Sequence, residues 1–138
     1  MVYDDFIGAV ARRTGVSGTD AAAITEATLT TLADRISGGE AEDLAGALPD
    51  RLGAYLNKAP TREPAESFGL GEFVRRVTER AGVDDVAADG GLRAVFATLR
   101  EAVAEHRFDD VVAQFPKDLR EAAEPTGSRV GARRGPLR

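Results

Sequence analysis

The sequence contains the same pattern twice, and this repeat limits the possible folds more than any other feature. When residues 70–124 are laid over residues 3–57 with a shift of 67 positions, the two stretches align without a gap. A short chain with such a register predicts a duplicated supersecondary unit, whose copies bury their apolar faces in themselves or against each other. The identical pairs include Phe6 with Phe73, Val10 with Val77, Arg13 with Arg80, Gly15 with Gly82, Leu32 with Leu99, Asp43 with Asp110, and Pro49 with Pro116.

Apolar residues in both copies recur with the 3.6-residue period of a helix that is buried along one face. This spacing predicts an all-α fold of two tandem repeats, related by a pseudo-two-fold axis and packed into one compact helical domain. We expect Leu44 and Leu48 to be buried, because both lie on the apolar side of a short helix. The expected helices span 3–14, 18–37, 40–47 and 49–57 in the first copy, and 70–81, 85–104, 107–114 and 116–124 in the second.

Glycines mark several expected helix ends. Gly15 and Gly82 each follow a helix, where a left-handed residue is least costly for glycine. The stretch 37–39, Ser-Gly-Gly, predicts a stop and turn after the first long helix. The second copy has Glu105 and His106 in place of the two glycines, so we expect a less sharp turn there. Gly90-Gly91 predicts a frayed or bent start of its long helix, since each glycine costs about 1 kcal/mol relative to alanine.

Composition divides the chain into one domain and a tail. Hydrophobic residues make up 43% and charged residues 30% of the chain, which is typical of a globular domain. We expect a single domain over 1–124, made of repeat one (3–57), a linker (58–69) that Pro60 and Pro64 keep from being helical, and repeat two (70–124). Residues 125–138 have almost nothing to bury, so we expect a disordered tail.

Charge is divided between the same two parts. The tail holds four arginines and no acidic residue, so the formal net charge of −5 divides into +4 on residues 125–138 and −9 on residues 1–124. An acidic body repels phosphate and is a poor nucleic-acid binder. Nucleic acid, an acidic membrane surface or an acidic protein, another copy included, can therefore be contacted only through the tail. The alternative is a solubilising end without a partner. The candidate contacts are Arg129, Arg133, Arg134 and Arg138.

The composition of the chain excludes several kinds of catalytic and metal site. The chain has no cysteine and only one histidine, His106, which excludes thiolate nucleophiles, cysteine-ligated metals and a multi-histidine site within one chain. Residues 84–91 are rich in aspartate but lack the spacing of a calcium loop. There is no phosphate-binding loop, dinucleotide fingerprint or G-x-S-x-G elbow. We therefore predict no catalytic residues, no metal and no cofactor. An acidic N-terminus and no long apolar run predict a cytoplasmic protein without a transmembrane segment.

Four polar residues at matched positions form the candidate site: Asp43 with Asp110, and Arg13 with Arg80. One interpretation is structural, because polar groups near a core usually cap helices or form pairs. Each aspartate would then cap a helix or meet a nearby arginine. The alternative is a shared acid–base or anion site near the pseudo-two-fold axis.

Two stretches resemble a known bacterial family, the domain of unknown function 2267. They are "YDDFIGAVARRTGVS", from Tyr3, and "ISGGEAEDLAGALP", from Ile36, which holds a Gly-Gly-Glu, an Asp-Leu and a Leu-Pro. The second copy departs from the family pattern at 105–108, where it reads Glu-His-Arg-Phe. The resemblance covers residues 3 to about 122. It implies an all-α fold and no particular activity.

Two functional hypotheses follow. The first is a non-enzymatic protein-interaction or scaffold module, with a protein partner or self-association. The alternative is a small-molecule-binding protein or enzyme with a site between the two repeats. A large apolar pocket ringed by the four matched polar residues would favour the second hypothesis, and a filled interface would favour the first.

Overall fold

The computed structural model describes residues 1–57 and 66–124, and all regular structure in these ranges is helical. This confirms the predicted all-α class. The expectations for the rest of the linker, 58–65, and for the tail, 125–138, lie outside the described residues. The helices are α1 (Tyr3–Thr14), α2 (Gly18–Arg35), α3 (Gly38–Gly46), α4 (Asp50–Leu56), α5 (Leu70–Ala81), α6 (Asp85–Ala102), α7 (Glu105–Val112) and α8 (Lys117–Ala123).

The helix bounds follow the repeat in the sequence. A shift of 67 positions converts the bounds of α1, α2 and α4 into those of α5, α6 and α8, and it converts the start of α3 into the start of α7. The two long helices each end two residues earlier than expected, at Arg35 and Ala102. They end there because Ile36 and Val103 adopt extended backbone angles while their side chains stay buried. The pseudo-two-fold axis itself remains a prediction.

The turn after α2 differs from the expectation. Ser37 is the N-cap of α3, its hydroxyl accepts a hydrogen bond from the Glu40 N–H at 3.3 Å, and Gly38 and Gly39 lie inside the helix. Serine is a preferred N-cap because its oxygen satisfies a free backbone donor. The corresponding residue of the second copy, Ala104, has nearly the same angles (φ −62°, ψ 141°) as Ser37 (φ −65°, ψ 157°). The predictions of a glycine stop and of a less sharp second turn were therefore wrong.

Gly91 allows two long helices to approach closely. Helix α6 runs unbroken from Asp85 to Ala102, so the frayed start predicted at Gly90-Gly91 was wrong. Gly91 is buried where α6 packs on α2, and a Cβ atom there would overlap the side chain of Ile24. Ile24 occupies the position that matches Gly91 in the first copy. A residue that is unfavourable for the helix is thus required by the packing.

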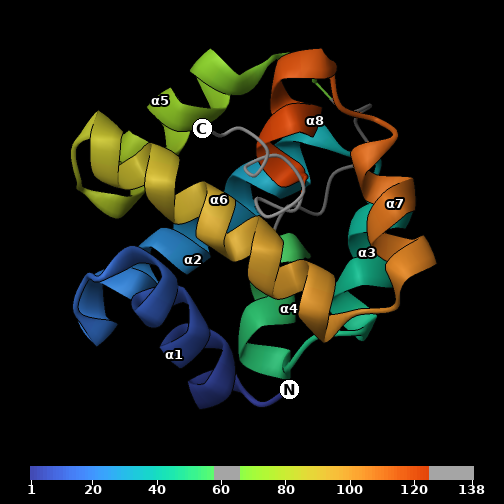
Figure 1. Ribbon diagram of the computed structural model, residues 1–138. Helices are drawn as coiled ribbons and strands as arrows, with labels where there is room; N and C mark the ends of the chain where they lie inside the picture. The colour runs from blue at the N-terminus through green and yellow to red at the C-terminus, as the bar shows by residue number, and fades with distance from the viewer. Residues whose placement is uncertain (58–65, 125–138) are drawn as a thin grey trace, which may run out of the picture.

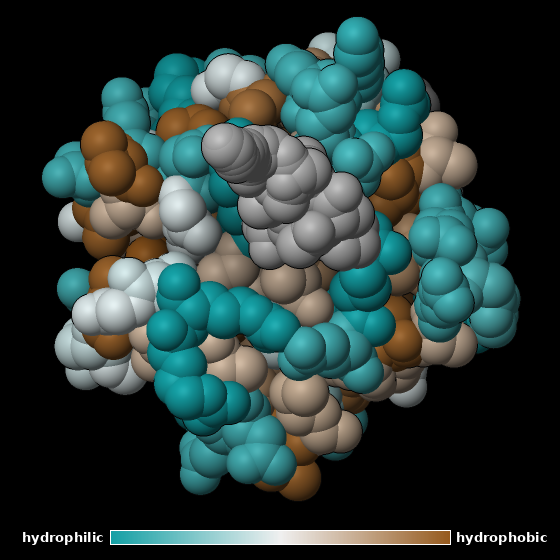
Figure 2. Space-filling view, in the orientation of Figure 1, coloured by the Kyte–Doolittle hydropathy of each residue, from teal (hydrophilic) through white to brown (hydrophobic). Residues whose placement is uncertain are grey.

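The two sets of four helices interlock (Figure 1). Helix α1 packs on α2 of its own set and on α6 of the other set, and α5 packs on α6 and on α2. On another side of the molecule α3 lies beside α7. Figure 2 shows that polar side chains cover much of one face and that the apolar areas between them stay separate. The exposed large hydrophobic residues of the described ranges are Met1, Val2 and Val86.

Buried residues from all eight helices form one hydrophobic cluster. Leu44 and Leu48 belong to it, with 0% and 7% of their surfaces exposed, which confirms the sequence prediction. Phenylalanine rings form part of the cluster, and Phe96 contacts Phe73 at 5.6 Å and Phe115 at 5.8 Å between ring centroids. The shared core therefore joins the helices of both copies.

Candidate functional site

Arg13, one of the four predicted site residues, connects the two helix sets. It lies at the end of α1 and reaches α6, where its guanidinium donates a hydrogen bond to the Thr98 hydroxyl at 2.7 Å. The same guanidinium forms an ion pair with Glu101, one turn further along α6. Because α1 packs on α6, the arginine links the first copy to the long helix of the second copy.

Arg80 makes the matching contacts in the opposite direction. It lies at the end of α5 and donates to the Thr31 hydroxyl of α2 at 2.9 Å. It also forms an ion pair with Asp34 of α2 at 2.9 Å. Thr31 and Asp34 are the residues that a shift of 67 positions places on Thr98 and Glu101. Each matched arginine therefore links its own copy to the other.

Asp43 and Asp110 lie away from these arginines. The Asp43 side chain on α3 is 61% exposed, and one of its oxygens lies 3.6 Å from a guanidinium nitrogen of Arg107 on α7. Asp110 is exposed on α7, and no ion pair involves it within residues 1–57 and 66–124. No contact among the described residues joins either aspartate to Arg13 or Arg80. The shared polar site of all four residues remains a prediction, and the contacts of the described residues do not bring the aspartates to the arginines.

Arg76 on α5 is the centre of an ion-pair network that the sequence analysis did not identify. Its guanidinium contacts Glu66 at 2.9 Å, Glu72 at 2.8 Å and Asp34 at 3.1 Å. Hydrogen bonds from Arg75 and then Arg76 lower the pKa of Glu72 to about 2. The hydrogen bond from Arg76 also lowers the pKa of Glu66. Since three carboxylates surround one guanidinium, this network joins α5 to α2 and does not offer Arg76 to a ligand.

The same network holds the residues that lead into α5. The Glu66 N–H donates to the backbone oxygen of Asp34 at 2.9 Å, and the Arg35 Nε–H donates to that of Phe68 at 2.9 Å. The Arg76 guanidinium lies 4.1 Å from the centroid of the Phe68 ring. Arg35 is buried, and this burial lowers its pKa. The described end of the linker is thus fixed to both helix sets.

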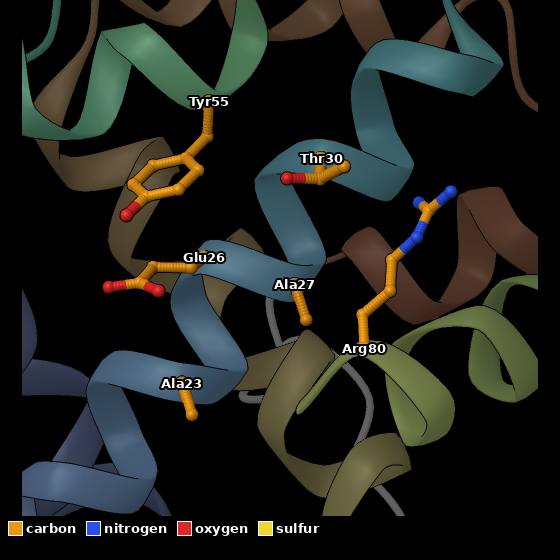
Figure 3. A pocket seen from close by; sticks show the side chains of 6 residues that line it. All are labelled: Ala23, Glu26, Ala27, Thr30, Tyr55 and Arg80. Atoms are coloured by element: carbon orange, nitrogen blue, oxygen red, sulfur yellow. The ribbon is translucent and has the colours of Figure 1, made fainter. Parts of the chain in front are cut away.

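A shallow pocket lies between α2, α4 and α5, with a volume of about 250 Å³ (Figure 3). Glu26 of α2 and Tyr55 of α4 lie on one side of it, and the tyrosine hydroxyl points toward the carboxylate. Arg80 of α5 lies on the opposite side. The remaining lining residues, all from α2, are Ala23, Ala27 and Thr30. The small side chains of α2 leave the pocket open between the polar side chains of Glu26, Tyr55 and Arg80.

Burial and the neighbouring Glu26 carboxylate raise the pKa of the Tyr55 hydroxyl, so the hydroxyl keeps its proton and remains a donor at neutral pH. The Arg80 guanidinium already contacts Asp34 and Thr31. No ion pair involving Glu26 occurs in the part of the chain that the structure describes. The pocket therefore combines a carboxylate that has no ion-pair partner but faces the phenol of Tyr55, and an arginine that is paired with Asp34.

Of the pocket residues, sequence reasoning singled out only Arg80. The positions that match Glu26 and Tyr55 in the second copy carry Arg93 and Ala122, so a search for matched polar pairs passes over both. A sequence signal does exist. Tyr55 places a hydroxyl on the apolar side of α4 at a position where the second copy has a small residue.

Within residues 1–57 and 66–124, no group of three or more His, Asp or Glu side chains is arranged so that it could hold a metal ion. His106 is exposed near the start of α7. Among the described helices, none is long and apolar enough to cross a membrane.

Comparison with known families supports the resemblance found in the sequence. The model of a family described as "Uncharacterized conserved protein (DUF2267)" matches residues 3–122. The chain belongs to the DUF2267 family. No curated protein matches it at a significant level.

The DUF2267 match begins at the first residue of α1 and ends within α8. It thus includes all six residues that line the pocket and both arginines that connect the helix sets. The tail lies outside the match. The family description assigns no reaction, so function must be argued from the residues themselves.

Proposed function

We propose that the chain is a non-enzymatic protein-interaction or scaffold module, with self-association as one form of that activity. The observation that carries the proposal is the filled contact between α2 and α6, where Ile24 occupies the space that a side chain at Gly91 would need. A ligand site at this contact has no room. The module's surface is then the part of the molecule that remains available for recognition.

The matched arginines support the same proposal. Arg13 and Arg80 each contact a threonine and an acidic residue of the opposite long helix. A guanidinium with such partners stabilises the arrangement of helices and is poorly placed for a reaction. Rigid helices held in this way present a fixed surface, which lowers the entropic cost of binding a partner.

The alternative is a small-molecule-binding protein or an enzyme with a site between the repeats. One observation favours it, because the walls of the pocket come from α2 and α4 of the first copy and from α5 of the second. A phenol beside a carboxylate can also hold a proton. Of the four matched polar residues, however, only Arg80 lines this pocket.

A photo-crosslinking experiment tests the proposed function. The residue p-benzoylphenylalanine is placed at Thr30, on the pocket, and in a control at Glu121, which is exposed on α8. The full chain is irradiated in the cells that produce it. We expect a crosslinked protein of one defined mass, which can be a second copy, at Thr30 and none at Glu121. The proposal is overturned if neither position crosslinks to protein and native mass spectrometry finds a small molecule bound in equimolar amount.

For the rest of the chain, we propose one domain over residues 1–124, a cytoplasmic location, and a tail at 125–138 that does not contribute to the fold. The tail's four arginines are proposed to contact an acidic neighbour electrostatically, so salt should weaken the contact. Deletion of the tail is expected to leave the melting temperature unchanged and to affect assembly only at low salt. A truncated protein that is destabilised at every salt concentration would contradict this assignment.

A further inference from the structure

We propose that the pocket between α2, α4 and α5 binds the side chain of an arginine from a partner protein, with Glu26 contacting the guanidinium and Tyr55 stacking on it. This inference rests on the proposed interaction function and names the chemistry that the partner must present. It concerns a site with a negatively charged end, at Glu26, in an acidic body.

Partly exposed aromatic rings in the part of the chain that the structure describes are stacked against arginines, with Tyr55 as the exception. Three rings are partly exposed, those of Tyr3, Tyr55 and Phe68. The Arg51 guanidinium lies 3.7 Å from the centroid of the Tyr3 ring, and that of Arg76 lies 4.1 Å from the centroid of the Phe68 ring. No arginine of the described residues lies over Tyr55. Tyr55 is therefore the partly exposed ring over which no arginine of residues 1–57 and 66–124 is stacked.

The charges around the pocket differ between its two ends. Glu26 has no ion-pair partner in residues 1–57 and 66–124, whereas the Arg80 charge is compensated by Asp34 at 2.9 Å. The Glu26 end of the pocket is consequently the end that favours a cation. Residues 1–124 carry a formal net charge of −9, which favours the approach of a basic partner.

The shape of the site favours arginine over lysine. A guanidinium is planar, so it can stack on an aromatic ring while its N–H groups donate to a carboxylate. The Tyr55 hydroxyl points toward Glu26, which places the carboxylate at the hydroxyl edge of the ring (Figure 3). The alanines at 23 and 27 leave room beside them. A lysine ammonium can satisfy the charge but cannot use the face of the ring in the same way.

A peptide titration tests the proposal with the full chain. The ¹⁵N-labelled protein is titrated at low salt with acetyl-Gly-Arg-Gly-amide, and the amide resonances of Ala23, Ala27, Thr30 and Tyr55 are followed. Two matched peptides replace arginine by lysine or by citrulline, which keeps the shape and removes the charge. We expect saturable shifts at the pocket with the arginine peptide, weaker binding of the lysine peptide and no binding of the citrulline peptide.

Variants connect the binding to the named residues. Glu26→Gln is expected to weaken binding of the arginine peptide by about fivefold, the order expected for a partly exposed charge pair. Tyr55→Leu should remove the preference for arginine over lysine. Glu42→Gln makes the same charge change at an exposed position of α3 and should leave the affinity unchanged.

The proposal is overturned if the shifts fall outside the pocket, if the citrulline peptide binds equally well, or if Glu26→Gln and Glu42→Gln have the same effect. The amide spectra of the variants report directly whether they remain folded. Because the titration measures the chemistry of the pocket and the crosslinking measures whether a protein occupies it, either hypothesis can fail without the other.

Discussion

Thr28 is a completely buried residue whose hydroxyl has no hydrogen-bond partner within the described residues. A buried polar group without a partner costs about 1–3 kcal/mol. Thr28→Val, which introduces the residue type of the matched position Val95, is therefore expected to raise the free energy of unfolding by about 1 kcal/mol, measured by urea denaturation.

Thr25 provides the control for this substitution. It is equally buried, but its hydroxyl donates to the backbone oxygen of Ala21 at 2.7 Å. Thr25→Val should bring no gain, because it removes a hydroxyl that already has a partner. Equal effects of the two substitutions would show that the Thr28 hydroxyl is not an unpaired group.

Two adjacent glycines of α6 are expected to respond in opposite directions. A methyl group at Gly91 would overlap Ile24, whereas one at Gly90 would meet no atom within 4 Å. Gly91→Ala should lower the free energy of unfolding by about 1–3 kcal/mol, as overpacking does. Gly90→Ala should raise it by up to about 1 kcal/mol, because alanine is the better helix former. Thermal and urea unfolding of both variants measure this difference, and a gain from Gly91→Ala would contradict the close packing of α2 on α6.

At the scale of the helix, α3 depends on its apolar side. Leu44 within it is fully buried, and Leu48, which follows its C-cap residue, is 7% exposed. Leu48→Ala is expected to lower the free energy of unfolding by about 2–5 kcal/mol. Asp43→Ala, on the exposed side of the same helix, should cost less than about 1 kcal/mol, since its ion pair with Arg107 is largely exposed. Melts of the two variants that lose stability equally would argue against this orientation of α3.

Helix α5 should show a defined pH dependence through Glu72. The carboxylate has a pKa of about 2 in the folded protein and an ordinary value of 4.5, so the folded state favours its charged form. Its stabilising effect is fully present above pH 4.5 and is lost as the pH falls toward 2. Glu72→Gln should therefore be less stable than the native chain at pH 7, and the difference should disappear near pH 2.

Denaturant melts at pH 7, 4 and 2 measure this effect, with Glu42→Gln as a control in which the carboxylate is exposed. A difference between native chain and Glu72→Gln that stays constant down to pH 2 would exclude a contribution from the charge of Glu72.

Helix positions could be predicted from the sequence because each copy carries the period and the end signals of a helix, as at Gly15 and Gly82. The glycines at 38 and 39 misled the prediction. The N–H groups of a helix's first turn have no backbone acceptor in a preceding turn, and the Ser37 hydroxyl supplies one, so α3 can begin at the glycines. The repeat shows in the sequence that Arg13 matches Arg80. The partners of Arg13 on α6 could not be predicted, because they depend on which helix of the other copy packs against α1.

The pocket could not be predicted from the sequence for a related reason. Its lining comes from α2, α4 and α5, which only the packing of the two copies brings together. Glu26 and Tyr55 have no matched counterparts of the same type, so the repeat that predicted the fold gave no indication of this site.

At the scale of the whole molecule, the predicted pseudo-two-fold axis can be tested by exchanging Ile24 and Gly91. Ile24→Gly alone should be strongly destabilising because it leaves a cavity and adds a glycine to α2, and Gly91→Ile alone should be destabilising because it overlaps Ile24. If an approximate two-fold axis relates the helix sets, the double variant restores the contact between one isoleucine and one glycine, with the two residues exchanged between α2 and α6. Its free energy of unfolding should then exceed that of either single variant. A double variant as unstable as the sum of both changes would argue against the axis.

The packing of α1 on α6 also determines when the chain can fold during synthesis. Part of the surface that α1 covers belongs to α6, which begins at Asp85, and the Thr98 hydroxyl that Arg13 contacts is translated 85 residues after Arg13. Contacts so distant along the chain form late and slow down folding. The first four helices must therefore wait with part of their apolar surface uncovered until α6 emerges. We expect this nascent intermediate to be the state in which the protein depends most on chaperones.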